Sequence, residues 1–282
     1  MKIKVADVRE ALALAAAAYY QHPSSKLRVI GVTGTNGKTT VAFMVKHLLE
    51  TAGVKTGLMG TIRHEIGERI LPAQRTTPEA LEIQQMLASM VRADCEACVM
   101  EVSSHALDQK RVHGVEFDAA VFTNLTQDHL DYHGTMENYF QAKKKLFASL
   151  GSGSKRGGSI VNIDDAFGQR LRSETKAEVQ LTYGLRESAM LRASEIQFGR
   201  SATQMVVETP DYHFPCRLPL IGRHNVYNAL AAVGAGVALK LGVAPLKMAL
   251  NTMEPVPGRL ENVAESCPFG VYVDYAHTED AL

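Results

Sequence analysis

The loop GVTGTNGKTT at residues 31–40 decides the fold. It follows the apolar run 27–32, which predicts a buried strand, and it leads directly into a helical pattern from Thr39 to about Thr51. In such a Gly-rich turn, backbone N–H groups and the positive end of the helix dipole bind phosphate oxygens. The sequence therefore predicts a nucleotide-binding loop inside an α/β domain.

The residue types of this loop fit ATP and Mg²⁺. Gly34 and Gly37 allow the backbone to approach an anion closely. Lys38 can reach the β- and γ-phosphates, and the Thr39 hydroxyl can bind Mg²⁺. The loop is a variant of the G-x-x-x-x-G-K pattern, because Val32 stands at the position of its first glycine. The predicted ATP-binding residues of the loop are Gly34, Thr35, Asn36, Gly37, Lys38, Thr39 and Thr40.

Strand and helix patterns alternate along much of the chain, which predicts a parallel sheet with helices on both faces. The segment 179–220 alternates with period two and predicts antiparallel hairpins at the edge of that sheet. Thr77 is the expected N-cap of the helix 78–92, and Gly242 is the expected C′ glycine of the helix 225–241. The further expected strands cover 55–59, 97–102, 119–123 and 160–163, and the expected helices cover 78–92, 135–150 and 225–241.

Composition excludes several classes of protein. The chain has 30 basic and 30 acidic residues, so it offers no overall positive field for nucleic acid. Four cysteines in 282 residues do not form a disulfide scaffold, and the Cys95–Cys98 pair leads into a strand rather than a redox helix. Asp7 and Glu10 interrupt any secretory signal, and no apolar run is long enough to span a bilayer. We expect a cytoplasmic monomer without nucleic-acid or membrane partners.

Two further polar residues follow predicted strands. Glu101 ends the strand 97–102, and His129 comes shortly after the strand 119–123. Ligands of open α/β sheets bind at the carboxyl ends of the strands, where the phosphate loop also lies. A carboxylate, an imidazole and the Thr39 hydroxyl near a triphosphate form a plausible Mg²⁺ site.

Three stretches resemble the Mur ligases: TGTNGKTT in the loop, EVSSH at 101–105 and NLTQDHLDYHG at 124–134. The first is also similar to the loop of folylpolyglutamate synthases. The resemblance implies that Glu101 and His129 are magnesium ligands and that Asn124 and Asp131 shape the site. Glu137, Tyr139, Ala142 and Lys143 match the family pattern E-x-Y-x-x-A-K. This match implies that CO₂ carbamylates Lys143, which would then offer oxygen atoms to a second Mg²⁺, while Lys144 and Lys145 are surface residues.

Other stretches resemble the substrate and nucleotide sites of the family member that extends the UDP-MurNAc dipeptide. TTP at 76–78 and SSHALDQKR at 103–111 imply substrate contacts, although the preceding Arg75 departs from some members. GRHNVYN at 222–228 is similar to the start of the family's adenine-side helix, and PVPGRLE at 255–261 is similar to the segment that approaches the γ-phosphate. VDYAH at 273–277 is similar to the ribose-binding strand. Glu279 stands where family members usually have a proline. The implied substrate residues are Thr76, Thr77, Ser103, Gln109 and Arg111, and the implied nucleotide residues are Asn225, Asn228, Arg259 and Asp274, with His277 nearby.

The resemblance implies an ATP-dependent amide-bond ligase. A substrate carboxylate would attack the γ-phosphate, and an amino group would displace phosphate from the acyl phosphate. The implied partners are UDP-MurNAc-L-Ala-D-Glu and diaminopimelate or lysine, and the implied catalytic residues are Lys38, Lys143, His129 and Arg259. We expect residues 1–26 to be a linker or helix remnant, 27–260 the central ATP-binding domain, and 261–282 the start of a C-terminal domain. Such a fragment would be weakly active or inactive alone.

Three alternatives remain open at this stage. A protein similar to folylpolyglutamate synthase would share the phosphate loop, although TTP and the Q-x-R of 109–111 argue against it. Another Mur ligase would add a different residue. A nucleotide-binding module without catalysis would bind ATP and not turn it over.

Overall fold

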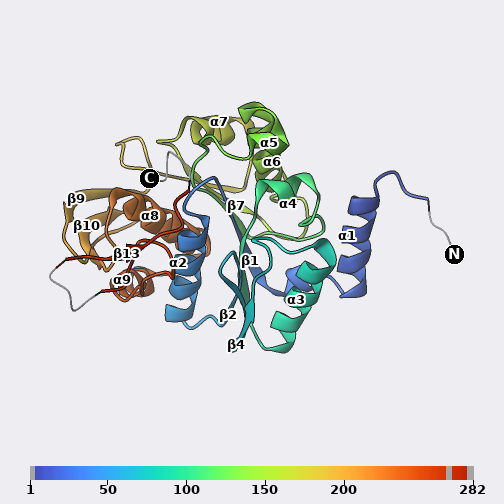
Figure 1. Ribbon diagram of the computed structural model, residues 1–282, viewed down its shortest axis with the longest axis horizontal. Coiled ribbons are helices and arrows are strands. Elements are labelled where there is room, and N and C mark those ends of the chain that lie inside the picture. Colours follow the sequence, from blue (N-terminus) through green and yellow to red (C-terminus); the bar gives the residue numbers. More distant parts are fainter. Residues whose placement is uncertain (1–3, 265–268, 278–282) are drawn as a thin grey trace.

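The computed structural model describes residues 4–264 and 269–277, and its centre is an eight-stranded sheet in the order β4-β3-β2-β5-β1-β6-β7-β8 (Figure 1). The strands β2, β5, β1, β6, β7 and β8 run parallel, and the β3–β4 hairpin is antiparallel at one edge. The strands are β1 (Arg28–Thr33), β2 (Thr56–Met59), β3 (Arg63–Ile66), β4 (Arg69–Pro72), β5 (Ala97–Glu101), β6 (Ala119–Phe122), β7 (Gly158–Asn162) and β8 (Val179–Tyr183). The predicted mostly parallel sheet is confirmed.

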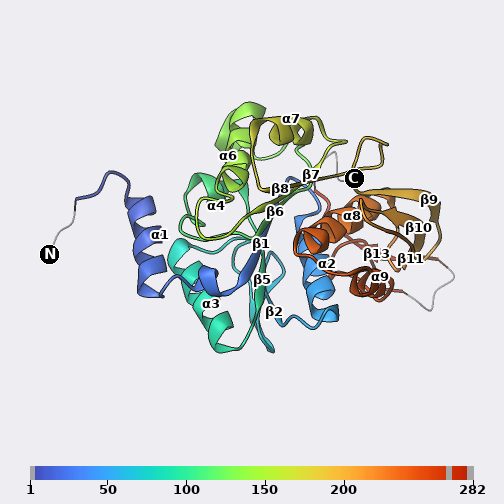
Figure 2. The same ribbon diagram turned by 180° about the vertical axis from the view of Figure 1, so that it is seen from behind.

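Helices cover both faces of this sheet (Figures 1 and 2). On one face, α2 (Lys38–Thr51), α8 (Arg223–Ala238) and α9 (Val243–Asn251) pack on strand residues such as Ile30 and Val121. On the other face, α3 (Ala80–Arg92), α4 (Ser104–Asp108), α6 (Met136–Ala148) and α7 (Ala166–Glu174) pack on Val29 and Phe122. Because the central strands are buried on both sides, their sequences are continuous apolar runs.

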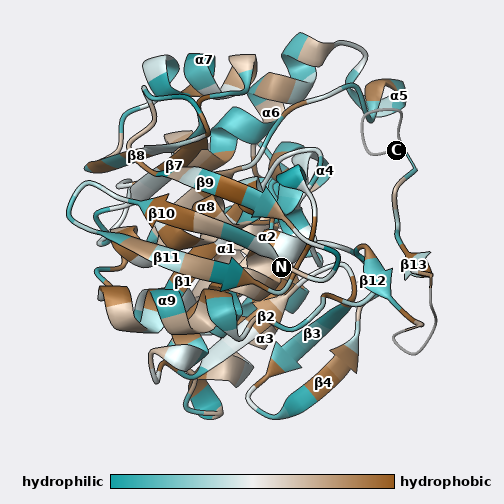
Figure 3. Cartoon of the chain, turned by 90° about the vertical axis from the view of Figure 1, so that its left-hand side faces the viewer, coloured by the Kyte–Doolittle hydropathy of each residue, from teal (hydrophilic) through white to brown (hydrophobic). Residues whose placement is uncertain are grey.

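A second sheet of three antiparallel strands lies beside α8 and α9. Its strands are β9 (Arg192–Phe198), β10 (Thr203–Glu208) and β11 (His213–Leu218), and Figure 3 shows them side by side with α9 next to β11. Burial alternates strictly along β11, as expected of a sheet with one covered face. Two details of the prediction were wrong. Residues 179–183 form the parallel edge strand β8, and β9–β11 make a separate sheet instead of extending the main one.

Two predicted helix ends also differ. The N-cap of α3 is Glu79, whose carboxylate forms a capping box with Glu82, while the Thr77 hydroxyl is buried and bonds to the end of β5. The helix α8 ends at Ala238, and Lys240 takes the left-handed conformation after it. Gly242 has an ordinary extended backbone and is the N-cap of α9. A short linker therefore separates these helices without the predicted glycine stop.

The two ends of the chain pack at different places. The helix α1 (Val8–Tyr19) lies against α3 through Ala13, Ala16 and Ala17, far from the second sheet (Figure 1). The 3₁₀ turn η1 (Pro23–Lys26) connects it to β1. After α9, the short strands β12 (Glu261–Asn262) and β13 (Tyr272–Val273) pair with each other, and Leu260 N–H donates to Asp274.

Two absences concern the described part of the chain. None of its helices combines the length and the apolar character needed to cross a membrane. Its three cysteines, Cys95, Cys98 and Cys216, are buried and form no disulfide, and Cys267 lies outside the described residues.

The helix α6 brings Lys143 to the site and is capped by Thr135, whose side chain accepts from the N–H of Asn138 at 3.1 Å. We expect Thr135→Ala to lower the free energy of unfolding by about 1 kcal/mol, because the N–H group loses its acceptor. Thr135→Ser keeps the oxygen and should stay close to wild type. Urea unfolding measures both, and an equal loss in the two variants would exclude capping as the cause.

Candidate functional site

The phosphate loop connects β1 to α2 and is fastened to the end of β6. Gly34 has φ +148°, and a Cβ there would stand 1.9 Å from the Thr123 hydroxyl oxygen. Asn124 accepts from the N–H of Asn36 at 2.9 Å, and its carbonyl accepts from the N–H of Thr35 at 2.9 Å. The loop conformation thus depends on the neighbouring strand as well as on its own glycines.

The other side of the loop contacts α8. Gly37 has φ +84°, and a Cβ there would lie 2.6 Å from the side-chain oxygen of Asn228. Asn228 in turn donates to Asn225 at 3.1 Å, and Asn225 donates to the carbonyl of Ile221 at 2.8 Å. Both asparagines are buried. The structure therefore brings the two residues predicted to lie on the adenine side against the phosphate loop.

Two lysines converge on one carbonyl group of the loop. Lys38 Nζ donates to Gly34 O at 3.0 Å and to Thr35 O at 2.7 Å. Lys143 Nζ, from α6, donates to the same Gly34 O at 2.8 Å and lies 4.5 Å from the centre of the Tyr139 ring. No ion pair joins either lysine to a carboxylate among the described residues. Two amines without paired carboxylates next to a phosphate loop make a site suited to anions.

Burial lowers the pKa of both amines. Lys143 is 1% exposed, and desolvation, with the nearby charge of Lys38, holds its pKa well below the usual lysine value. Desolvation also lowers the pKa of Lys38, partly offset by the carboxylates of Glu101 and Asp128. Lys143 therefore holds a neutral amine far more readily than a surface lysine does.

A second group of contacts surrounds Glu101, which is fully buried at the end of β5. Its Oε2 accepts from the hydroxyls of Thr39 and Thr61, each at 3.0 Å, and its Oε1 accepts from the N–H of Thr61 at 2.8 Å. Arg259 reaches in from the segment after α9, and its Nη2 donates to Thr39 Oγ1 at 3.1 Å. Thr39, Glu101 and Arg259, predicted separately, thus form one contact chain.

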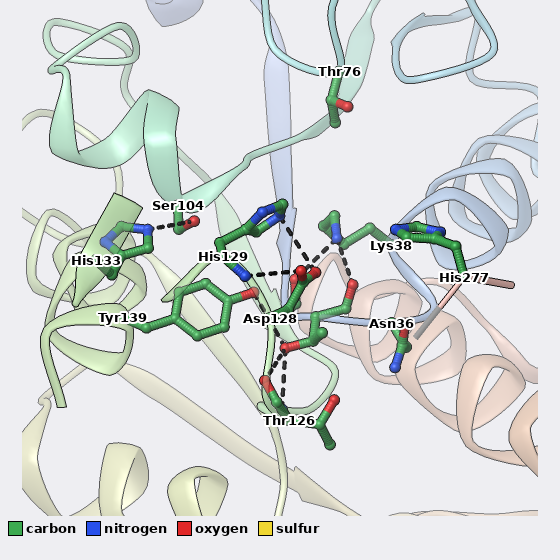
Figure 4. A network of polar contacts seen from close by, with 12 residues as sticks. Asn36, Lys38, Thr76, Ser104, Thr126, Asp128, His129, His133, Tyr139 and His277 are labelled. Atoms are coloured by element: carbon green, nitrogen blue, oxygen red, sulfur yellow. Dashed lines mark hydrogen bonds and ion pairs between the residues drawn. The ribbon is translucent and has the colours of Figure 1, made fainter. Parts of the chain in front are cut away.

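His129 belongs to a different group of side chains, shown in Figure 4. It has a left-handed backbone with φ 53°, and its N–H donates to Asp128 Oδ1 at 2.8 Å. Asp128 lies between His129 and Lys38 (Figure 4). The His129 ring packs edge-on against His105 and Tyr139. Desolvation is the largest cause of its lowered pKa, so the ring favours the neutral form that binds metals.

His129 and Glu101 share no direct contact among the described residues. No three His, Cys, Asp or Glu side chains in that part of the chain are close enough to hold a metal ion by themselves. The predicted magnesium ligands instead contact the phosphate loop and its helix in two pairs: Glu101 bonds to Thr39, and Lys143, whose charge affects His129, bonds to Gly34 O.

The residues predicted to bind substrate form a continuous cluster. Thr77 Oγ1 donates to the carbonyl of Glu101 at 2.8 Å and accepts from the N–H of Ser103 at 3.0 Å. Arg111 donates to the carbonyl of Thr77 at 3.0 Å and to Gln109 at 2.6 Å. Glu101 therefore links this cluster to the phosphate-loop residue Thr39: its carbonyl accepts from Thr77, and its carboxylate accepts from Thr39.

The remaining predicted residues lie at the edges of the site. The carboxylate of Asp274 accepts from the N–H groups of Leu260 and Ala276, each at 2.6 Å, and His277 folds back on the carbonyl of Tyr275. Thr40 is buried inside α2, and Asp131 is exposed in the short helix α5 (Leu130–His133). Glu279 lies outside the described residues.

Sequence reasoning missed three residues of the site. Thr61 and Thr123 belong to no recognisable motif, and their roles follow only from long-range contacts. Tyr139 matched the family pattern around Lys143 without a role, and its hydroxyl lies 3.2 Å from Thr35 Oγ1. Asp128 had a signal, because it directly precedes His129 in the same stretch.

The contact between Gly34 and Thr123 leads to a prediction. Gly34→Ala should lower the free energy of unfolding and abolish nucleotide binding, because the new Cβ must displace the Thr123 hydroxyl and the loop. Gly53→Ala is the matched control: it has φ +82° and open space around its Cβ position, so it should cost only the backbone strain of about 1–2 kcal/mol. Urea unfolding and calorimetry with ATP compare them; equal losses of stability would contradict the steric explanation.

Comparisons with known proteins agree with this geometry. The family model described as Mur ligase middle domain matches residues 32–236. UDP-N-acetylmuramoyl-L-alanyl-D-glutamate–2,6-diaminopimelate ligase from Geobacter metallireducens is 44% identical over 99% of this chain and 55% of its own length. The enzyme of the same name from Synechococcus elongatus is 49% identical over 95% of this chain and 53% of its own length. The chain thus spans about half the length of the curated relatives it matches.

Solved structures give the same result. A structure of UDP-N-acetylmuramoyl-L-alanyl-D-glutamate–2,6-diaminopimelate ligase superposes with a TM-score of 0.86 at 30% identity, over 100% of this chain and 59% of that one. MurF from Acinetobacter baumannii gives 0.78 at 26% identity, over 96% and 55%. The apo form of L. casei FPGS gives 0.72 at 18% identity, over 99% and 75%, and this likeness concerns the fold alone. With its phosphate loop, its strand-end carboxylate and a family match over most of its length, this chain belongs to the Mur ligase family.

Proposed function

We propose that this chain is the ATP-binding part of a ligase that adds diaminopimelate or lysine to UDP-MurNAc-L-Ala-D-Glu, working in the cytoplasm. The central domain would comprise residues 27–260. A linker and helix would precede it at 1–26, and a C-terminal domain would start at 261–282. The observation that carries the proposal is the pair of buried lysines on Gly34 O, set beside the Thr39–Glu101–Arg259 contacts. The substrate class comes from the relatives, which are named as ligases of UDP-N-acetylmuramoyl-L-alanyl-D-glutamate and 2,6-diaminopimelate.

The loop residues fit the phosphates of ATP. Lys38 can turn from two neutral carbonyl acceptors to phosphate oxygens, which are stronger acceptors because they are charged. Arg259 already contacts Thr39 next to the loop, and its guanidinium would stabilise negative charge on the transferring γ-phosphoryl group. Asn225 and Asn228 offer both donors and acceptors for an adenine edge.

The donor atoms also fit Mg²⁺. Thr39 Oγ1 and Glu101 Oε2 are buried oxygen atoms 3.0 Å apart, and the Arg259 guanidinium already places a cation on Thr39. On the other side of the loop, His129 and a carbamylated Lys143 would be the ligands. When bound, Mg²⁺ would neutralise charge on the phosphates.

The environment of Lys143 supports its carbamylation. A neutral amine would attack the carbon of CO₂, an N–C bond would form as one C=O double bond becomes a C–O⁻ bond, and one proton would leave to solvent. The lowered pKa of Lys143 favours the neutral amine, and the carbamate keeps one N–H group that can still donate to Gly34 O. The neutral amine would thereby become an anion near Lys38 and His129, which suits a metal site.

The chain's residues would act by position and charge. The acceptor carboxylate, held by Arg111, Ser103 and Thr76, would attack the γ-phosphorus, and the bond to the leaving ADP oxygen would break. The amine of the amino acid would then attack the acyl carbon, and phosphate would leave. Lys38 and Arg259 would stabilise the phosphoryl charge during the first step. Because the chain spans about half of its relatives, we expect little turnover from it alone.

The first test concerns the nucleotide. We expect calorimetry to detect binding of ATP with Mg²⁺ to the wild-type chain and none to Lys38→Ala, because that amine is the charged donor nearest the loop. Lys46→Ala serves as the control, since Lys46 is also on α2 but pairs with Glu50 and Glu65. Binding that survives in Lys38→Ala would argue against this phosphate-binding role.

The second test concerns Lys143. After incubation with ¹³C-bicarbonate, we expect the ¹³C NMR spectrum to contain a carbamate signal that Lys143→Met lacks. Lys144→Met should keep the signal, because Lys144 is ion-paired with Glu174 on the other side of the helix. An identical spectrum for wild type and Lys143→Met would rule out carbamylation at this position.

A further inference from the structure

The turn between β2 and β3 wraps around the carboxylate of Glu101. Glu101 is completely buried, and Thr61 supplies two of the three hydrogen bonds that its side chain accepts: the N–H at 2.8 Å and the hydroxyl at 3.0 Å. The third comes from Thr39. One residue outside every recognised motif therefore contacts both oxygens of the proposed metal ligand.

Gly60 makes this approach possible. A Cβ at residue 60 would stand 2.6 Å from Glu101 Oε1, so the carboxylate would have to move away from its present place. The N–H of Gly60 donates to His64, which fixes the next part of the turn. The backbone is thus shaped so that the N–H of Thr61 reaches the carboxylate, and this observation is independent of the Thr61 hydroxyl.

The Thr61 hydroxyl also contacts Thr76, and the two oxygens are 3.0 Å apart. Thr61 has one hydroxyl proton, and the carboxylate is the stronger acceptor because it is charged. The Thr61 hydroxyl is placed to donate to either oxygen, so Glu101 and Thr76 compete for its one proton. These bonds form a chain from a proposed substrate contact to a proposed metal ligand.

We propose that Thr61 is a positioning residue that fixes the Glu101 carboxylate for Mg²⁺ and couples it to Thr76. This inference rests on the proposed function. The buried carboxylate has several side-chain rotamers, and its two bonds to Thr61 select the one that faces Thr39 and the loop. Substrate binding at Thr76 would leave the Thr61 proton to Glu101 and so favour the metal-binding orientation.

The test uses Mn²⁺ as a probe of the magnesium site. Electron paramagnetic resonance titration of the full 282-residue chain with Mn²⁺ in the presence of ADP gives the metal dissociation constant. We expect Thr61→Val, which keeps the N–H and loses the hydroxyl, to weaken Mn²⁺ binding on the order of tenfold, the size of one hydrogen bond to a charged group. Thr61→Ser restores the hydroxyl and should bind as wild type does.

Thr56→Val is the matched control. Its hydroxyl is buried on the adjoining strand and donates only to the carbonyl of Val54, so its loss should leave Mn²⁺ affinity unchanged. Thermal unfolding of all variants identifies any that fail to fold, and Thr61→Ala replaces Thr61→Val in that case. Thr76→Val should bind Mn²⁺ at least as tightly as wild type, because it leaves the Thr61 proton to Glu101, and the double variant should match Thr61→Val, because Thr76 acts only through Thr61.

The outcomes separate the two proposals. Wild-type affinity in folded Thr61→Val, or an additive loss in the double variant, would overturn the role of Thr61 and leave the proposed function intact. A tenfold loss that Thr61→Ser does not restore would likewise reject the hydroxyl as its cause. Absence of any Mn²⁺·ADP binding to the wild-type chain would overturn the proposed function, and the inference with it.

Discussion

The carbonyl oxygen of Gly34 accepts from two buried lysines, and the rest of the site depends on this contact. Lys38 comes from the first turn of α2, and Lys143 comes from the opposite face of the sheet through α6. Their two amines share one small space, and desolvation lowers the pKa of each. A phosphate oxygen beside the loop would be a stronger acceptor for them than the carbonyl oxygen, because it is charged.

Local sequence patterns correctly predicted those helices and strands whose structure is set by their own residues. The alternation of apolar runs and helices gave the central parallel strands, and the Gly-rich loop located the phosphate site. The errors occurred where contacts with a segment distant in sequence determine the structure. Residues 179–183 contain the same β-forming residue types as the hairpins after them, and only their pairing with β7 makes them a parallel strand. Thr77 is a good N-cap by composition, but the end of β5 uses its hydroxyl.

The same distinction holds for the site. Motif resemblance located Thr39, Glu101 and Arg259, and the structure joins them by direct contacts. Motif resemblance could not reveal Thr61, because a threonine in a turn has no pattern of its own. Its role depends on the carboxylate of Glu101, 40 residues later in the chain. Nor could the sequence indicate that His129 and Glu101 belong to no three-residue metal-binding group among the described residues, since both simply follow strands.

The bond between Arg259 and Thr39 joins positions 220 residues apart, and that between Lys143 and Gly34 joins positions 109 apart. Closing loops of this length costs entropy before any contact compensates for it, so such contacts form late in folding. The site is therefore assembled only when nearly the whole chain is in place. A folding intermediate that already has the sheet and its helices would still lack the paired groups of the site, and chaperones and proteases would meet it before any nucleotide could stabilise it.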